Sequence, residues 1–544
     1  MMRWPTWLWW MICVGGVTAV LYWRRPDAFY NPQFWAEDGN IFFTNAYFLG
    51  DKSLITPYAG YFHTLARIVA WVGSYLPVQY APHWYTAAAW GMFIFIITYL
   101  FSARFPFQNN LKFLLGLALV VTTADNEVYF NLANWATITS IIWLLLAISN
   151  EPDSHRQAIF DAALLLLTGL NSPFSISLWL LFLLRWIIRR TDHSLKLWLA
   201  SLLVALIQIW HMFARAATET GVLAFPVLRD GILYRFGFLF LGETIYGVPL
   251  TNISRSLILA AMIGLYGYLL WHAMKQKNWP VLTILAGGIL SATLSLYVMR
   301  YNPSGLMYSA GRHFYIPAVT LVWALLLVTD TRKWLPLFAT FIAFLFLTPG
   351  SKNQVLPDMN WAEETAKCIG TQPLCLISTN PVLEPPVWWA AIDSHVFEAP
   401  AMDVVFVSQF GEHIELLGYN AVQDDTAVHL QFVWRSSGKM QDDYKFLIQL
   451  VDDDDPNRIV IQNDLAPLDG QYPTSSWLEQ EVVIDPVILP LETIPAGQYQ
   501  IMVGWYNPQI GVQLTAYDAQ QRRWKSDWVA LPLAVEVDGN GRHP

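Results

Sequence analysis

Two adjacent carboxylates, Glu37 and Asp38, stand between aromatic residues in the stretch "NPQFWAEDGNIFF". One acid of such a pair could act as a general base that deprotonates a hydroxyl group, while the other orients it or raises its pKa by like-charge repulsion. Asp38 could instead cap a helix that begins at Gly39, which is a common role for Asp. A cap leaves Glu37 unexplained, so the pair predicts chemistry at this loop.

His63 and Arg67 are four residues apart in "GYFHTLARIVAWVGSYLP", which is predicted to be an amphipathic helix at the membrane interface. On one helix face they could bind a phosphate or a sugar hydroxyl, or they could face water. Glu127 and Asn134 belong to "TTADNEVYFNLANWATITS", where they are expected at the outer end of a helix. A carboxylate and an amide suit sugar hydroxyls, although a polar hairpin tip would have a similar composition.

Three further candidates occur in "MRYNPSGLMYSAGRHFYIPAV", namely Arg300, Arg312 and His313. Arg312 is expected where a helix begins, so its guanidinium could bind a phosphate at the membrane surface. An arginine that snorkels to lipid headgroups is the alternative.

These residues belong to a chain of 544 residues, of which 55% are hydrophobic and 13% charged. An ordinary soluble domain has about a quarter charged residues, so the composition predicts an integral membrane protein. Residues 1–350 contain 22 Lys and Arg against 14 Asp and Glu, a net charge of +8; residues 351–544 contain 10 against 27, a net charge of −17. This contrast predicts two domains of different character.

The apolar stretches predict an α-helical polytopic domain over residues 1–350, with long outer loops at 24–81 and 213–253. The first apolar stretch is expected to be an uncleaved helix rather than a signal peptide. Eleven spanning helices are expected, near 5–23, 82–103, 110–124, 133–149, 157–171, 173–190, 194–212, 254–274, 279–299, 314–330 and 334–349.

Lysine and arginine cluster in the loops that are inner if the N-terminus is cytoplasmic, which predicts that the C-terminal region is extracytoplasmic. The outer face would have arginine but only one lysine, Lys52. Because the arginine fork suits bidentate phosphate recognition, this predicts an anionic substrate at the outer leaflet, although some of these arginines would bind lipid headgroups instead. They are Arg24, Arg25, Arg67, Arg215, Arg229, Arg235, Arg255, Arg300 and Arg312.

The pattern changes after residue 350 to a short α/β linker, 351–405, and then to alternating apolar and polar runs over 406–544. Short runs with Asp, Gly, Pro and Asn between them predict a soluble all-β sandwich. Cys368 and Cys375 flank "IGTQPL" and could form a disulfide if this half is extracytoplasmic, or remain reduced.

What the sequence lacks is also informative. A glycine-rich phosphate loop is absent, which argues against a soluble nucleotide donor, and no Ser/His/Asp spacing is recognisable. Few charges lie within the expected spanning helices, which argues against a proton-coupled transporter.

"WAEDG" together with "PYAGYFHTLARIVA" and "GRHFYIP" resembles a bacterial branch of the GT-C type glycosyltransferases, which use polyprenyl-phosphate-linked sugars. The resemblance implies that Asp38, assisted or replaced by Glu37, is the catalytic base, and that Arg312, with Arg300 or His63, holds the donor phosphate. The segment at about 410–537 resembles the β-sandwich appended to many bacterial membrane glycosyltransferase-like proteins. Such modules imply carbohydrate binding, for which Trp434, Trp477, Trp505 or Tyr506 could stack on sugars, although strand aromatics usually pack inward.

The expected function is therefore transfer of a sugar, by single-displacement inversion, to a glycan, lipid or protein acceptor outside the plasma membrane of a bacterium. We expect contact with membrane lipid, no nucleic acid partner and no cofactor; a divalent metal is compatible with paired acids, but arginine alone can neutralise a lipid monophosphate. The alternatives are a lipid-linked sugar transporter or flippase, which needs a polar pathway to the cytoplasmic side, and a membrane-anchored carbohydrate-binding protein.

Overall fold

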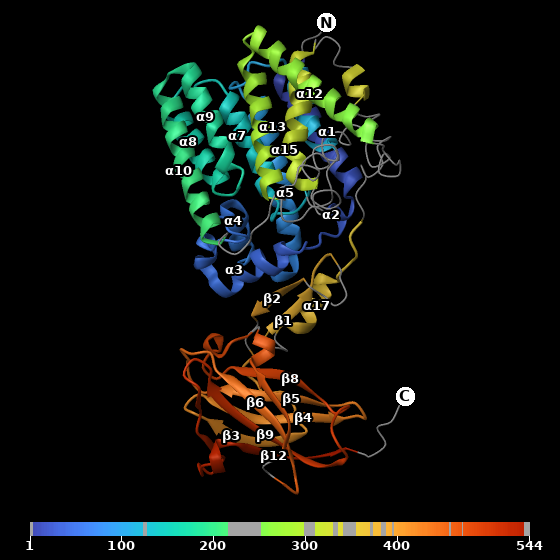
Figure 1. The fold of residues 1–544 in the computed structure, drawn as a ribbon, viewed down its shortest axis with the longest axis vertical. Coiled ribbons are helices and arrows are strands. Elements are labelled where there is room, and N and C mark those ends of the chain that lie inside the picture. The colour runs from blue at the N-terminus through green and yellow to red at the C-terminus, as the bar shows by residue number, and fades with distance from the viewer. Residues whose placement is uncertain are drawn as a thin grey trace. The chain divides into compact units, whose positions relative to one another are not determined.

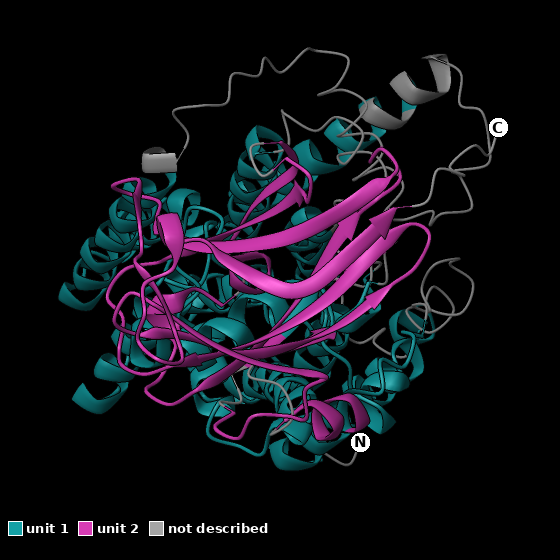
Figure 2. Cartoon of the chain, turned by 90° about the horizontal axis from the view of Figure 1, so that it is seen from below, with its two compact units in different colours: residues 1–362, 378–390 teal, residues 363–377, 391–544 magenta. Residues whose placement is uncertain are grey.

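The computed structural model describes residues 4–122, 128–215, 252–298, 311–329, 336–340, 355–369, 374–381, 388–393, 396–455, 458–470 and 472–537. The chain forms two compact units, one of residues 1–362 and 378–390 and one of residues 363–377 and 391–544 (Figure 2). The expected linker, 351–405, is thus divided between the two units.

The first unit is helical, as its apolar composition predicts, and its longer helices lie side by side in a bundle (Figure 1). Its α-helices are α1 Thr6–Arg24, α2 Asp27–Tyr30, α3 Thr44–Leu49, α4 Thr64–Gly73, α5 Ala81–Phe101, α6 Asn109–Val121, α7 Trp135–Ile148, α8 His155–Gly169, α9 Ser175–Arg189, α10 Asp192–Arg215, α12 Asn252–Lys275, α13 Trp279–Val298 and α15 Tyr315–Val328. Short helical turns occur at η1 Asp38–Phe43, η2 Gly50–Ile55, η3 Val78–Tyr80 and η8 Gly311–Phe314.

The expectation of eleven spanning helices is not supported. Among the described residues four helices are long and apolar enough to cross a membrane: Thr6–Arg24, Val78–Phe101, Asp192–Met212 and Trp279–Val298. Helices α6, α7 and α15 are apolar but have only 13 or 14 residues. At 1.5 Å per residue they rise about 20 Å, which is less than the roughly 30 Å of hydrocarbon. The last expected span, 334–349, lies mostly outside the described residues.

Close helix packing in this bundle depends on small residues. A Cβ added to Gly169 of α8 would lie 2.1 Å from Trp143 of α7, and one added to Gly287 of α13 would lie 2.3 Å from Leu144 of α7. Helix α7 is buried along its whole length. It is therefore the central helix against which α8 and α13 pack.

The second unit contains α17 Trp361–Cys368 from its third residue onward and an all-β region in which alternate strand residues are buried. Its antiparallel sheets have the orders β11-β3-β4-β5-β8 and β10-β9-β6-β7, with β12 paired to β9. The strands are β1 Leu374–Ser378, β2 Trp389–Asp393, β3 Val404–Phe410, β4 Ile414–Gln423, β5 Ala427–Ser436, β6 Lys445–Asp452, β7 Ile459–Leu465, β8 Val482–Pro490, β9 Gly497–Asn507, β10 Val512–Gln513, β11 Ala516–Asp518 and β12 Val529–Val537.

The aromatic residues of these two sheets form their common core. Trp434 of β5 and Trp505 of β9 pack edge to face at 5.1 Å between ring centroids. Trp434, Trp477 and Trp505 are all fully buried, so they do not offer stacking surfaces to a sugar. Tyr506 is only partly exposed, and its hydroxyl donates to Asp464 at 2.5 Å.

Candidate functional site

The acidic pair lies on a tightly held loop of the first unit. Ala36 has a φ of 34°, a left-handed conformation that costs a residue with a Cβ about 1–2 kcal/mol. The π-helix η1 begins two residues later, at Asp38. Strained backbone and π-helical turns are both enriched at functional sites.

Asp38 is not among the residues that line the cavity beside Glu37. Its side chain is buried, and it accepts hydrogen bonds from the Leu132 and Ala133 N–H groups at 2.9 and 2.8 Å. The N-cap residue of η1 is Glu37 rather than Asp38, and both Asp38 oxygens bind the turn before α7. Burial raises the pKa of Asp38 to about 8, although both amide bonds oppose this shift. Asp38 thus attaches the acidic loop to α7.

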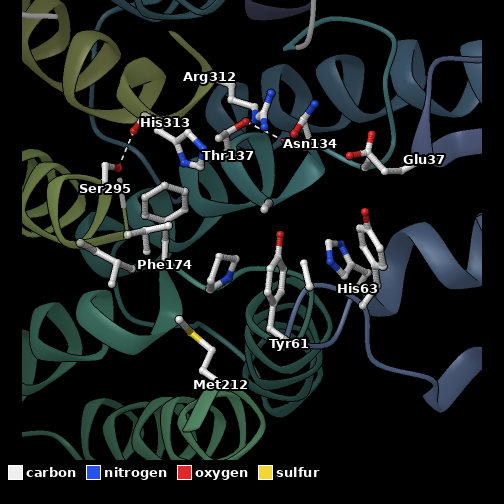
Figure 3. A pocket seen from close by; sticks show the side chains of 17 residues that line it. Glu37, Tyr61, His63, Asn134, Thr137, Phe174, Met212, Ser295, Arg312 and His313 are labelled. Carbon is white, nitrogen blue, oxygen red and sulfur yellow. Dashed lines mark hydrogen bonds between the residues drawn. The ribbon is translucent and has the colours of Figure 1, made fainter. Parts of the chain in front are cut away.

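Glu37 lines a cavity of about 240 Å³ (Figure 3). Its walls come from the loop at 24–81, the starts of α7 and α9, the end regions of α10 and α13, and η8. They are Glu37, Tyr58, Ala59, Tyr61, His63, Ala133, Asn134, Ala136, Thr137, Pro173, Phe174, Met212, Leu294, Ser295, Val298, Arg312 and His313. The cavity combines one carboxylate and one guanidinium with aromatic and aliphatic walls, and its size suits a single small polar ring.

Arg312 and His313 reach this cavity from η8, which is fastened to α13. Ser295 Oγ donates to the His313 carbonyl at 2.7 Å. The next residues begin α15, where the Tyr315 hydroxyl donates to the Leu119 carbonyl at 2.6 Å. These two bonds fix the direction from which the cationic side chain of Arg312 approaches.

The Tyr61 hydroxyl points into the cavity in Figure 3 and experiences both of its charges. Burial raises the pKa of Tyr61; the Arg312 cation opposes this shift and the Glu37 carboxylate adds to it. Tyr61 therefore stays a neutral hydrogen-bond donor between a cation and an anion.

His63 lines the cavity, whereas Arg67 lies behind it. Both are buried, so the interpretation that they face water is wrong. Among the described residues, neither ring nitrogen of His63 makes a well-aligned hydrogen bond, and the three Arg67 guanidinium nitrogens have no hydrogen-bond partner either. Arg67 stacks on Phe42, with 4.9 Å between its guanidinium carbon and the ring centroid. Burial first, and then the Arg67 charge, lower the pKa of His63 to about 3, so its imidazole is neutral.

The arginines that were predicted to lie on the outer face do not form one set. Arg24 donates to the Val121 and Thr122 carbonyls at the end of α6, and Arg25 pairs with Asp27 at 2.8 Å. These two contacts are structural. Arg229, Arg235 and Arg300 lie outside the described residues, as do the side chains of Arg215 and Arg255.

Of the other predicted residues, some are described by the structure and some are not. Asn134 lines the cavity from the position just before α7, while Glu127 lies outside the described residues. Cys368 and Cys375 form a disulfide in the second unit. No group of three or more His, Cys, Asp or Glu side chains in the described part of the chain is arranged to hold a metal ion.

Sequence reasoning missed the aromatic and small polar walls of the cavity. Tyr61 follows Gly60, whose φ is 85°, and Thr137 lies in the first turn of α7. Phe174 precedes α9, and Ser295 lies one turn before the end of α13. The available signal was positional, because all four lie at helix or loop ends on the side where Asn134 was expected.

At the opposite helix ends lies a buried network of charges. Arg104 makes a bidentate pair with Asp161 at 2.9 and 2.7 Å, and Arg185 pairs with Glu151 at 2.8 Å. Between this network and the cavity, α7 is buried and apolar from Ile141 to Leu146. Among the described residues, this stretch of α7 therefore contributes no polar side chain between the network and the cavity.

No family model matches the chain, and no curated protein matches its sequence.

Proposed function

We propose that the protein is a membrane glycosyltransferase that transfers a sugar from a polyprenyl-phosphate carrier to a glycan, lipid or protein hydroxyl on the outer side of a bacterial plasma membrane. The observation that supports this most is the joint presence of Glu37 and Arg312 on one cavity large enough for a single sugar ring. These residues are far apart in sequence, and each supplies a charge that the reaction needs.

In the proposed reaction the Glu37 carboxylate accepts the proton of the acceptor hydroxyl while the hydroxyl oxygen attacks the sugar C1. The bond from C1 to the phosphate oxygen breaks, and the lipid phosphate leaves with the bonding electron pair. Arg312 stabilises the charge that develops on that phosphate. One displacement inverts the configuration at C1.

The neutral walls have a complementary role in this proposal. Asn134, Tyr61 and neutral His63 offer hydrogen bonds to sugar hydroxyls, and Phe174 offers a ring face to the sugar. A transporter would need polar groups along the bundle, and the apolar stretch of α7 gives that alternative less support.

The test is transfer from a panel of polyprenyl-phosphate sugars by the purified protein, with wild type compared to Glu37→Gln. We expect kcat to fall by a factor of about 10² to 10⁴ because the amide cannot accept the proton. Glu364→Gln, which removes an exposed carboxylate from α17, is the matched control and should retain wild-type activity.

Full activity of Glu37→Gln would refute the assignment of the base. Movement of the donor across liposomes without transfer from any donor would favour the transporter instead.

A further inference from the structure

The chain returns to the helical unit after it has already entered the second one. Residues 363–377 belong to the second unit, residues 378–390 to the first, and residues from 391 onward to the second again. Residues 378–390 are assigned to the first unit because they contact it. Their described ends, 378–381 and 388–390, show what they contact there.

The first end pairs with the backbone directly before the acidic pair. The Asn380 N–H donates to the Phe34 carbonyl at 3.1 Å, and the Ala36 N–H donates to the Asn380 carbonyl. Trp35 and Asn380 thereby form a parallel β-bridge. Asn380 is itself fixed, because its side-chain Nδ2 donates to the Pro357 carbonyl at 3.1 Å.

The second contact lies directly after the acidic pair, at Gly39. A Cβ added there would lie 2.7 Å from Cγ2 of Thr379 and 3.4 Å from Cβ of Ala390. Asn40 continues the contact, since its Nδ2 donates to the Trp389 carbonyl at 3.0 Å. Both ends of the returning segment therefore touch the loop.

The segment compensates for an unfavourable backbone. Ala36 has a positive φ, and this conformation persists only where surrounding structure holds it. The hydrogen bond from Ala36 to Asn380 holds it on one side of Glu37, and the hydrogen bonds of Asp38 to the turn before α7 hold the other. Glu37 is thus fixed through both of its neighbours.

We propose that residues 378–381 and 388–390 are a positioning brace for Glu37, which aims this carboxylate into the cavity through Ala36 and Gly39. The proposal rests on the proposed function insofar as Glu37 is the base. Because catalysis depends on placement to within about an ångström, displacement of the brace should lower turnover far more than it lowers donor binding.

The experiment pairs Gly39→Ala with Thr379→Ser. The first change creates the collision with the Thr379 methyl group, and the second removes that methyl group and keeps the hydroxyl. We expect Gly39→Ala to lower kcat at least tenfold with less than a threefold change in KM, and the double variant to return within threefold of wild type. Gly91→Ala, which meets nothing within 4 Å, is the control and should match wild type.

A second readout does not need activity. In a Glu37→Cys background, the rate of alkylation by a small thiol reagent reports how position 37 faces the cavity. Gly39→Ala should change this rate at least fivefold, and Thr379→Ser should restore it. The native cysteines do not interfere, because Cys13 is buried and Cys368 and Cys375 are joined.

The results separate the two proposals. Restoration of alkylation by Thr379→Ser, with no transfer from any donor by wild type, would support the brace and refute the glycosyltransferase. A Gly39→Ala variant that matches wild type, or one that Thr379→Ser fails to restore, would refute the brace. If Gly39→Ala does not fold, Asn40→Ala replaces it: loss of the bond to Trp389 should change the alkylation rate at least twofold, and an unchanged rate would refute the brace.

Discussion

At the scale of residues, the cavity depends on which side chains remain neutral. His63 and Arg67 lie one turn apart, both buried, and neither has a well-aligned hydrogen-bond partner. The charge of Arg67 is tolerated through its contact with the Phe42 ring, and it disfavours a second cation on His63. A neutral imidazole can accept or donate a hydrogen bond, which a sugar hydroxyl requires.

This arrangement predicts a specific dependence of stability on pH. The pKa of His63 is about 3 in the folded protein, well below the ordinary value of 6.5. Between these pH values His63 is protonated in the unfolded chain but neutral in the folded protein. The free energy of unfolding therefore falls as the pH decreases from about 6.5 towards 3. At pH 5 the loss attributable to His63 is about 2 kcal/mol, from about 1.4 kcal/mol per pKa unit.

The measurement is thermal unfolding in detergent at pH 7 and pH 5 for wild type and His63→Phe, which keeps an aromatic ring beside Phe42. We expect His63→Phe to lose less stability on acidification than wild type. His83→Gln, which changes an exposed histidine at the start of α5, should behave as wild type. Equal losses in wild type and His63→Phe would contradict the prediction.

At the scale of elements, the two ends of the bundle have different tasks. One end holds the cavity between the starts of α7 and α9 and the end regions of α10 and α13. The other end is fixed by ion pairs that connect the loop after α5 to α8, and α9 to the loop after α7. Because Asp161 is fully buried, its pairing with Arg104 keeps α8 attached to the α5–α6 loop.

Removal of one partner from this pair should be costly. Arg104→Met leaves buried Asp161 with His193, at 3.1 Å, as its remaining ion-pair partner among the described residues, and we expect a loss of about 3–5 kcal/mol in unfolding free energy. Arg189→Met breaks a half-exposed pair with Glu151 and should cost less than about 1 kcal/mol. Denaturant unfolding in detergent, followed by tryptophan fluorescence, measures both; equal effects would show that burial of Asp161 is not decisive.

At the scale of the whole molecule, a helical unit with membrane-like helices is joined to a β-rich unit by a chain that passes between them more than once. The disulfide Cys368–Cys375 lies in the second unit, just before the returning segment. Disulfides persist in oxidising compartments, which agrees with the extracytoplasmic location predicted from the loop charges.

Cysteine labelling tests this topology. In intact spheroplasts, a membrane-impermeant maleimide should label Ser437→Cys, an exposed position of the β-rich unit. It should label Lys277→Cys, in the short loop between α12 and α13, only after permeabilisation. The reverse pattern would place the β-rich unit in the cytoplasm and would remove the outer-leaflet site from the proposal.

The sequence by itself determined the features of this protein that follow from local composition. Apolar stretches predicted the helical unit, and alternating runs predicted the β-rich one, because both signals are local. Local signals also located the loop of Glu37 and Asp38. They did not give the number of spanning helices, because several apolar runs fold into helices of only 13 or 14 residues.

Only the tertiary structure decided how the two acids differ. Neighbouring side chains on a helical turn point in different directions, so just one of them needs to face the cavity. The choice depends on amides 94 and 95 residues away, which bind Asp38, and on a segment near Asn380 that pairs with Ala36. No local pattern contains those partners, and for that physical reason Glu37, rather than Asp38, could be assigned to the cavity only once the chain was folded.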